Sequence, residues 1–122
     1  MLPSLKYLDI RFNELEGDVP DALFELKLDA IFINNNKFRF SLPESIDESP
    51  VSVLVIANND LRGCFPSGLA KMASTLTELI IMNSSLTGCL PPEIGLLKNL
   101  TVFDAFWCDS GENMFVADLG KL

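Results

Sequence analysis

The chain has 122 residues and carries seventeen acidic against nine basic side chains, which gives a net charge of −8 without a single histidine. This acidity argues against a protein that binds nucleic-acid phosphates and favours a neutral or basic partner. No apolar run approaches the roughly 18 residues that a membrane-spanning helix requires. Without histidine, a closely spaced cysteine pair or a glycine-rich phosphate loop, the sequence offers no metal site, no cofactor site and no enzyme active site.

Four copies of one pattern follow one another along the chain. The first copy reads LxxLxLxxNxLxGxxPxxLxxL from Leu5 onwards, and its asparagine position recurs at intervals of 23, 23 and 25 residues. Such intervals are typical of a leucine-rich repeat. Residues 1–105 are therefore predicted to hold four full repeats and the start of a fifth. Residues 106–122 are predicted to be a divergent tail without repeats.

Each copy predicts one short strand followed by a turn. In the first copy Leu8 and Ile10 alternate with solvent-facing residues, and equivalent alternations fall at residues 31–33, 54–56 and 79–81. The proline near the middle of each copy can neither donate to a β-ladder nor sit inside a helix, so the chain must turn back there. Because no coil buries its apolar side alone, successive coils must stack. The predicted fold is an α/β leucine-rich repeat solenoid with parallel strands on its concave face and few regular helices.

The recurring asparagines are predicted to have a structural role. They fall where the strand bends, and a buried amide there can satisfy backbone groups of its own coil and of the adjacent coil. The predicted asparagine ladder consists of Asn13, Asn36 and Asn59. Ser84 takes this place in the fourth copy and can satisfy fewer groups. Glycines four residues further on are predicted to adopt turn dihedrals that a side chain would oppose. These glycines are Gly17, Gly63 and Gly88.

The solvent-facing side chains of parallel strands form columns across the concave face, where solenoids usually bind their partners. The candidate ligand-binding residues are Tyr7, Asp9, Arg11, Asp29, Phe32, Asn34, Val55, Glu78, Ile80, Met82 and Asp104. Four of them are apolar and would form a stripe rimmed by carboxylates, which is the kind of patch that marks a protein interface. These four are Phe32, Val55, Ile80 and Met82. The alternative is that a β surface simply favours such residues.

Acidic residues on the opposite, convex side are expected only to be solvated. They are Asp21, Glu25, Glu44, Asp47 and Glu48.

Two cysteines, Cys64 and Cys89, occupy one repeat position on neighbouring coils. Their separation should be near one rung, about 4.8 Å, which permits a disulfide. Two free buried thiols are the equal alternative. Cys108 has no obvious partner.

Two N-glycosylation sequons are present. Asn83 begins the first, Asn83-Ser84-Ser85, and Asn99 begins the second, Asn99-Leu100-Thr101. Their placement in the repeat is compatible with a secreted protein, although such triplets also arise by chance.

The LxGxxP form of the repeat resembles the plant-specific class found in receptor ectodomains, polygalacturonase inhibitor proteins and leucine-rich repeat extensins. Three strings resemble the repeat domain of the extensins in particular. They are LPSLKYLDIRFNELEGDVPDALFELKLDAIFINNNKFRFSLPESI, VSVLVIANNDLRGC and ELIIMNSSLTGCLPPEIGLLKNLTVFD. The resemblance runs from Leu2 to Asp104 and includes the Gly-Cys-x-Pro units at 63–66 and 88–91. It implies plant-type repeats of 23 to 25 residues.

The resemblance also implies a function. An extensin of this class is expected in the cell wall, where its repeats recognise secreted, basic, cysteine-rich peptides of the rapid alkalinization factor type and contribute to wall organisation. A proline-rich extensin tail, expected to be missing from this chain together with a signal peptide and the first repeats, would associate with wall polysaccharides. The alternatives are a polygalacturonase inhibitor that binds enzymes through the same face, and a truncated fragment without function.

Overall fold

The computed structural model describes residues 4–63, 65–84 and 92–104. The predicted pair Cys64 and Cys89 and the predicted tail at 106–122 lie outside these residues.

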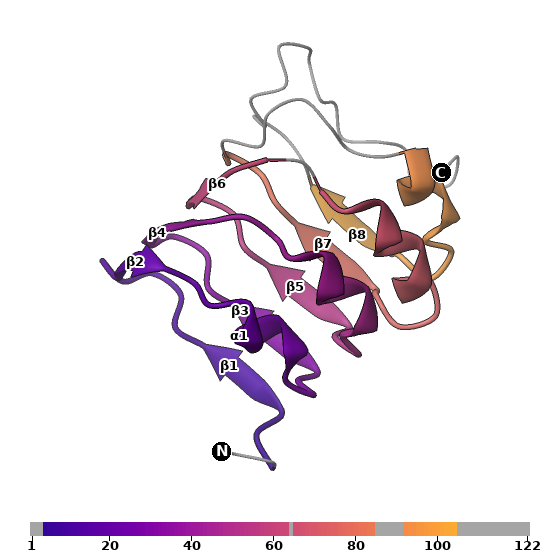
Figure 1. Ribbon diagram of the computed structural model, residues 1–122, viewed down its shortest axis with the longest axis horizontal. Helices are drawn as coiled ribbons and strands as arrows, with labels where there is room; N and C mark the ends of the chain where they lie inside the picture. Colours follow the sequence, from indigo (N-terminus) through magenta and orange to yellow (C-terminus); the bar gives the residue numbers. More distant parts are fainter. Residues whose placement is uncertain (1–3, 64, 85–91, 105–122) are drawn as a thin grey trace.

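Five short parallel strands form the main sheet, in the order β1-β3-β5-β7-β8 (Figure 1). The strands are β1 (Tyr7–Asp9), β3 (Ala30–Phe32), β5 (Val53–Val55), β7 (Glu78–Ile80) and β8 (Val102–Asp104). Their register joins the repeat leucines, because Leu8 pairs with Ile31 and Ile31 with Leu54. Each coil therefore contributes one strand to this main sheet, and the predicted leucine-rich repeat solenoid is confirmed.

A second sheet of three parallel strands, which the sequence did not predict, lies along one side of the solenoid. It consists of β2 (Glu16–Asp18), β4 (Lys37–Phe40) and β6 (Asp60–Leu61). Gly17 pairs with Phe38, an offset of 21 residues, whereas the main sheet pairs residues 23 apart at this point. The two-residue difference corresponds to about 7 Å along a strand, so the coils are staggered on this side. Gly17, the middle residue of β2, has a φ of 100°, a backbone conformation that favours glycine.

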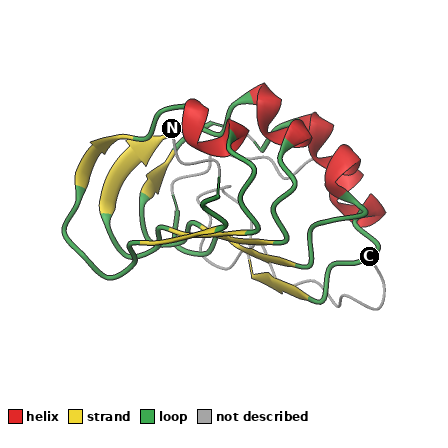
Figure 2. Cartoon of the chain, turned by 90° about the horizontal axis from the view of Figure 1, so that it is seen from below, coloured by secondary structure: helices red, strands yellow, loops and turns green. Residues whose placement is uncertain are grey.

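Short helices cover the side of the molecule opposite the main sheet (Figure 2). They are α1 (Ala22–Glu25) and the 3₁₀ helices η1 (Glu44–Glu48), η2 (Ser67–Met72) and η3 (Pro92–Leu96). Successive helices pack against each other along the stack. Pro43 and Pro66 precede η1 and η2 in extended conformation, so the repeat proline marks the start of these two helices.

Two of these helices form a polar contact between coils. Nζ of Lys71 lies 3.2 Å from Oδ2 of Asp47, whose side chain is 16% exposed. A Cβ added to Gly68 would lie 2.9 Å from the same carboxylate oxygen, so the absence of a side chain lets η2 approach η1 closely. The expectation that Asp47 is only solvated is therefore wrong, because the packing of two coils partly covers its carboxylate.

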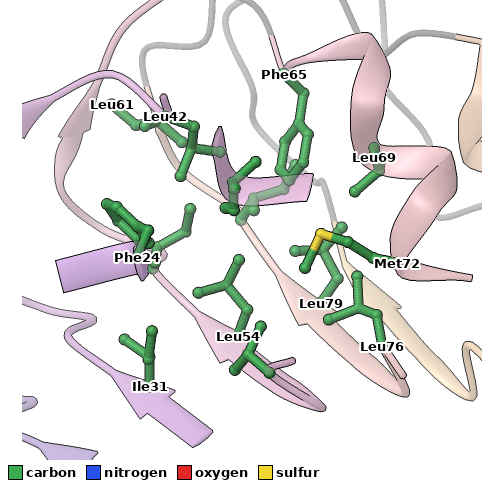
Figure 3. Packing of buried hydrophobic residues seen from close by; sticks show 14 of the residues in the cluster. Phe24, Ile31, Leu42, Leu54, Leu61, Phe65, Leu69, Met72, Leu76 and Leu79 are labelled. Atoms are coloured by element: carbon green, nitrogen blue, oxygen red, sulfur yellow. The ribbon is translucent and has the colours of Figure 1, made fainter. Parts of the chain in front are cut away.

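One continuous apolar core fills the space between the sheets and the helices (Figure 3). Leu54 and Leu79 enter it from the main sheet, and Leu69 and Met72 enter it from η2; all four are buried. Phe40 stands at the repeat glycine position of the second coil, where it is buried and stacks on Phe24 with ring centroids 6.1 Å apart. The core is shared by all coils, as a solenoid requires.

Candidate functional site

The outer face of the main sheet, the side away from the core, is the candidate site. Leu8 in β1 points toward the core while Tyr7 and Asp9 are exposed, as the alternation of a strand requires. The register then aligns one residue from each strand in a column across this face. That column consists of Asp9, Phe32, Val55, Ile80 and Asp104.

A neighbouring column begins with Tyr7, which is 66% exposed, and includes Glu78 on β7. Glu78 is half-buried, and Asp29, just before β3, is exposed. Together with Asp9 these carboxylates distribute negative charge over the outer face. In the first coil two cationic residues, Lys6 and Arg11, flank Asp9 in the sequence.

The predicted apolar stripe is only partly exposed. Phe32, Ile80 and Met82 are half-buried, but Val55 is 8% exposed and is therefore buried. The reason is that strands lie about 4.8 Å apart, so the larger Phe32 and Ile80 on both sides shield the smaller valine. The prediction of an exposed Val55 is wrong, and the apolar contact surface of the site is supplied by its neighbours.

Asn34 is also buried, with 8% of its surface exposed. The prediction that it belongs to the ligand-binding surface is therefore wrong. Its Nδ2 donates to Oδ1 of Asn35 at 2.8 Å. Its own Oδ1 is buried and accepts no hydrogen bond among the described residues. The side chain is therefore packed into the end of the strand and is not available as ligand surface.

The first two coils bring three site residues together. Nη2 of Arg11 lies 3.0 Å from Oδ2 of Asp9, and its guanidinium carbon lies 4.8 Å from the ring centroid of Phe32. Both charged side chains are about half exposed, so the ion pair itself contributes little to stability. Its effect is local: the guanidinium covers an aromatic face and is held there by the carboxylate.

The repeat asparagines bind the backbone of two coils. Nδ2 of Asn59 donates to the carbonyl of Ile33 at 2.9 Å, and its Oδ1 accepts the amide of Phe38 at 3.0 Å. Asn36 repeats this arrangement one coil earlier, donating to Ile10 at 3.0 Å and accepting from Leu15 at 3.2 Å. Both side chains are buried.

Asn13 differs from this pattern. Its Nδ2 donates only within its own coil, to the carbonyls of Ile10 at 2.9 Å and Arg11 at 3.1 Å, and the residue is exposed. Within residues 4–63, 65–84 and 92–104 no coil lies beyond the first one, because β1 is the edge strand of the main sheet, so nothing there covers Asn13. The predicted burial is therefore wrong for Asn13.

The structure contains a second asparagine ladder, which was not predicted from the sequence. Asn35, Asn58 and Asn83 each lie three residues after the end of a strand, following β3, β5 and β7, with φ of 59°, 55° and 50°. Nδ2 of Asn58 donates to Oδ1 of Asn35 at 3.2 Å, and Nδ2 of Asn83 donates to Oδ1 of Asn58 at 2.6 Å. Asparagine tolerates this left-handed conformation better than most residues. Its recurrence one residue before the repeat asparagine position was the available signal.

Hydroxyl groups form a third ladder, at the edge where the strands begin. Oγ of Ser52 donates to the carbonyl of Asp29 at 3.1 Å, and Oγ1 of Thr77 donates to that of Ser52 at 3.0 Å. Thr101 continues the ladder by donating to Thr77 at 3.1 Å. Hydrogen-bond ladders of side chains therefore run along both edges of the main sheet, where its strands begin and where they end.

Other features of the described residues give no sign of chemistry. They contain no group of three or more histidine, cysteine, aspartate or glutamate side chains placed to hold a metal ion. None of their helices is long and apolar enough to cross a membrane. The second sheet carries an open depression lined by acidic and basic side chains of β2 and β4 in equal number, which gives it no preferred charge.

This arrangement of stacked coils, parallel strands and asparagine ladders defines a leucine-rich repeat solenoid. The family model of the Leucine Rich Repeat matches residues 4–26. Leucine-rich repeat extensin-like protein 6 of Arabidopsis thaliana is 68% identical over 81 residues, which is 66% of this chain and 17% of that protein. Leucine-rich repeat extensin-like protein 2 of the same plant is 59% identical over 82 residues, 67% of this chain and 10% of that protein.

These matches confirm the resemblance to the leucine-rich repeat extensins, and the chain spans less than a fifth of the length of either relative. Among solved structures, the Arabidopsis receptor kinase HAESA, in complex with the peptide hormone IDA and the co-receptor SERK1, is similar over 86% of this chain and 18% of its own. The TM-score is 0.77 and the identity 33%.

Proposed function

We propose that this chain is an extracellular peptide-binding module of the plant cell wall. Its ligand is a secreted, basic, cysteine-rich peptide of the rapid alkalinization factor type, and its binding contributes to wall organisation. An extensin tail outside this sequence would associate with wall polysaccharides. The observation that carries the proposal is the outer face of the main sheet, where half-buried apolar side chains are bordered by carboxylates.

The charge of this face supports a basic ligand. Asp9, Asp29 and Glu78 lie on or beside it, whereas Arg11 is already paired with Asp9 at 3.0 Å. With a net charge of −8 the whole chain attracts cations over a range of about one Debye length, roughly 8 Å at physiological salt. Such a field speeds the encounter with a basic peptide and makes it salt-dependent.

The apolar side chains support a protein ligand of some size. Phe32 on the second coil and Ile80 and Met82 on the fourth coil are half-buried and expose part of their surface. The register places Phe32 and Ile80 on the same side of the sheet, with Val55 between them. A partner that covers them gains hydrophobic contact, while the surrounding polar residues form the rim that interfaces usually have. The similarity to the peptide-bound receptor HAESA and the extensin-like relatives supports the same conclusion.

The test is isothermal titration of the secreted 122-residue chain with oxidised rapid alkalinization factor peptides. A triple variant of the outer face, Asp9→Asn, Asp29→Asn and Glu78→Gln, is compared with a convex-side control, Asp21→Asn, Glu44→Gln and Glu48→Gln. Both variants remove three negative charges. An exposed ion pair contributes about 0.5 kcal/mol, so the loss of three should cost about 1.5 kcal/mol, which corresponds to about tenfold in affinity. The control should lose much less.

Equal losses in the two variants would contradict binding at the outer face. A fungal polygalacturonase is titrated in parallel, and saturable binding of that enzyme without peptide binding would favour the inhibitor function instead. A folded chain that binds neither would refute the proposal and leave a fragment without ligand-binding function.

A further inference from the structure

The sequon Asn99-Leu100-Thr101 lies at the edge of the main sheet where the strands begin, between η3 and β8. Leu100 is buried in the core, and the residues on both sides of it are exposed. The backbone is fixed by two hydrogen bonds, from Leu100 N to Leu97 O at 3.2 Å and from Thr101 N to Thr77 O at 2.7 Å. The asparagine side chain is thus held on the surface by its buried neighbour.

Asn99 is exposed, and its amide nitrogen makes one hydrogen bond. Its Nδ2 donates to the carbonyl of Ser74 at 3.1 Å, and no second hydrogen bond from this nitrogen is found among the described residues. An amide nitrogen carries two N–H groups, so replacement of one leaves the other for Ser74. A glycosylated Asn99 therefore keeps the contact it has in the folded chain.

The other sequon offers a less favourable setting. Asn83 lies at the opposite edge, where the strands end, with a φ of 50°. Its Nδ2 is 2.6 Å from Oδ1 of Asn58, and it is part of the ladder of left-handed asparagines. A sugar on this nitrogen would have to fit beside a short contact that joins two coils.

We propose that Asn99 carries an N-linked oligosaccharide, which stands at the edge where the strands begin and leaves the outer face open to ligand. The inference rests on the extracellular location in the proposed function. In the reaction Nδ2 of Asn99 attacks the anomeric carbon of an N-acetylglucosamine on a lipid-linked oligosaccharide pyrophosphate. The N–C bond forms, the bond from that carbon to the pyrophosphate oxygen breaks, the lipid pyrophosphate leaves, and the nitrogen loses one proton.

The full chain is expressed with a secretory leader in plant leaf cells and recovered from the secretory fraction. Enzymatic release of N-glycans in ¹⁸O-labelled water, followed by peptide mass mapping, reports which asparagine was occupied. We expect the ¹⁸O label at position 99. The variants Asn99→Gln and Thr101→Ala should lose this oligosaccharide, whereas Thr101→Ser should keep both the sugar and the hydroxyl that donates to Thr77.

An unlabelled Asn99 in the recovered chain would overturn the inference, whether or not position 83 is labelled. Ser85→Ala removes the other sequon without altering Asn83 and should leave the label at position 99 unchanged. Peptide titration of the same samples keeps the two proposals separate. Asn99→Gln should bind the peptide as the unaltered chain does, and failure of peptide binding with a labelled Asn99 would refute only the proposed ligand.

Discussion

Replacement of Asn59 by alanine tests whether the repeat asparagine holds two coils together. The substitution removes the bonds to Ile33 O at 2.9 Å and from Phe38 N at 3.0 Å, both of which lie in the preceding coil. Two hydrogen bonds contribute about 1 kcal/mol each, and a buried backbone group left without a partner adds about 1 kcal/mol or more. Because Asn59 is buried, we expect a loss of about 3 kcal/mol in the free energy of unfolding.

Asn13→Ala is the matched control. Asn13 occupies the same repeat position but is exposed and bonds only its own coil, so its loss should be about 0.5 kcal/mol. Urea unfolding followed by circular dichroism measures both values, and the midpoint of thermal unfolding should fall by roughly 12 °C for Asn59→Ala. If the two variants differed by less than about 1 kcal/mol, the account of coil-to-coil bonding would be refuted.

Three further predictions use the same unfolding assay. Gly68→Ala should cost about 1 to 3 kcal/mol, since its Cβ would meet Oδ2 of Asp47 at 2.9 Å, and Asp47→Ala in the same chain should recover part of that loss. Asn58→Ala breaks two rungs of the left-handed ladder and should cost about 2 kcal/mol, whereas Asn58→Gly keeps the dihedral and should cost less. Phe40→Ala leaves a cavity beside Phe24 and should cost about 3 to 5 kcal/mol, and a loss below about 1 kcal/mol would contradict its role in the core.

The main sheet could be predicted from the sequence because its signal is apolar and periodic. Leu8, Ile31 and Leu54 recur at one interval and alternate with polar neighbours, which determines both the strand and the side of the sheet that is buried. The second sheet lacks such a signal. Its first strand, β2, consists of exposed Glu16, Gly17 and Asp18, and it forms only because stacked coils bring its backbone beside that of β4.

The sequence predicted which residues of the candidate site align across the strands, but it did not predict which of their side chains are exposed. Register follows from the repeat interval, so the alignment of Asp9 with Phe32 needs only the sequence. Burial depends on the sizes of neighbouring side chains across strands, and this explains why Val55 and Asn34 are covered. The ion pair between Arg11 and Asp9 likewise depends on rotamers that no repeat pattern specifies.

The hydrogen-bond ladders at both edges have a consequence for the outer face. Thr77 bonds the neighbouring coil just before β7, and Asn83 bonds Asn58 of the same neighbouring coil just after it. The side chains of β7 between these two contacts are therefore not required to hold the coils in register. Ile80→Thr should therefore cost less than about 1 kcal/mol, since threonine keeps a β-branched side chain on a half-buried surface.

The adjacent residue provides the contrast. Leu79 points into the core from the same strand and is completely buried, so Leu79→Ala should cost about 3 kcal/mol. Urea unfolding of the two variants separates the two sides of one strand, and peptide titration of Ile80→Thr should show weaker binding despite a nearly unchanged fold. Equal losses of stability at Ile80 and Leu79 would show that the outer face is a second core surface, and the site would then have to be sought elsewhere on the solenoid.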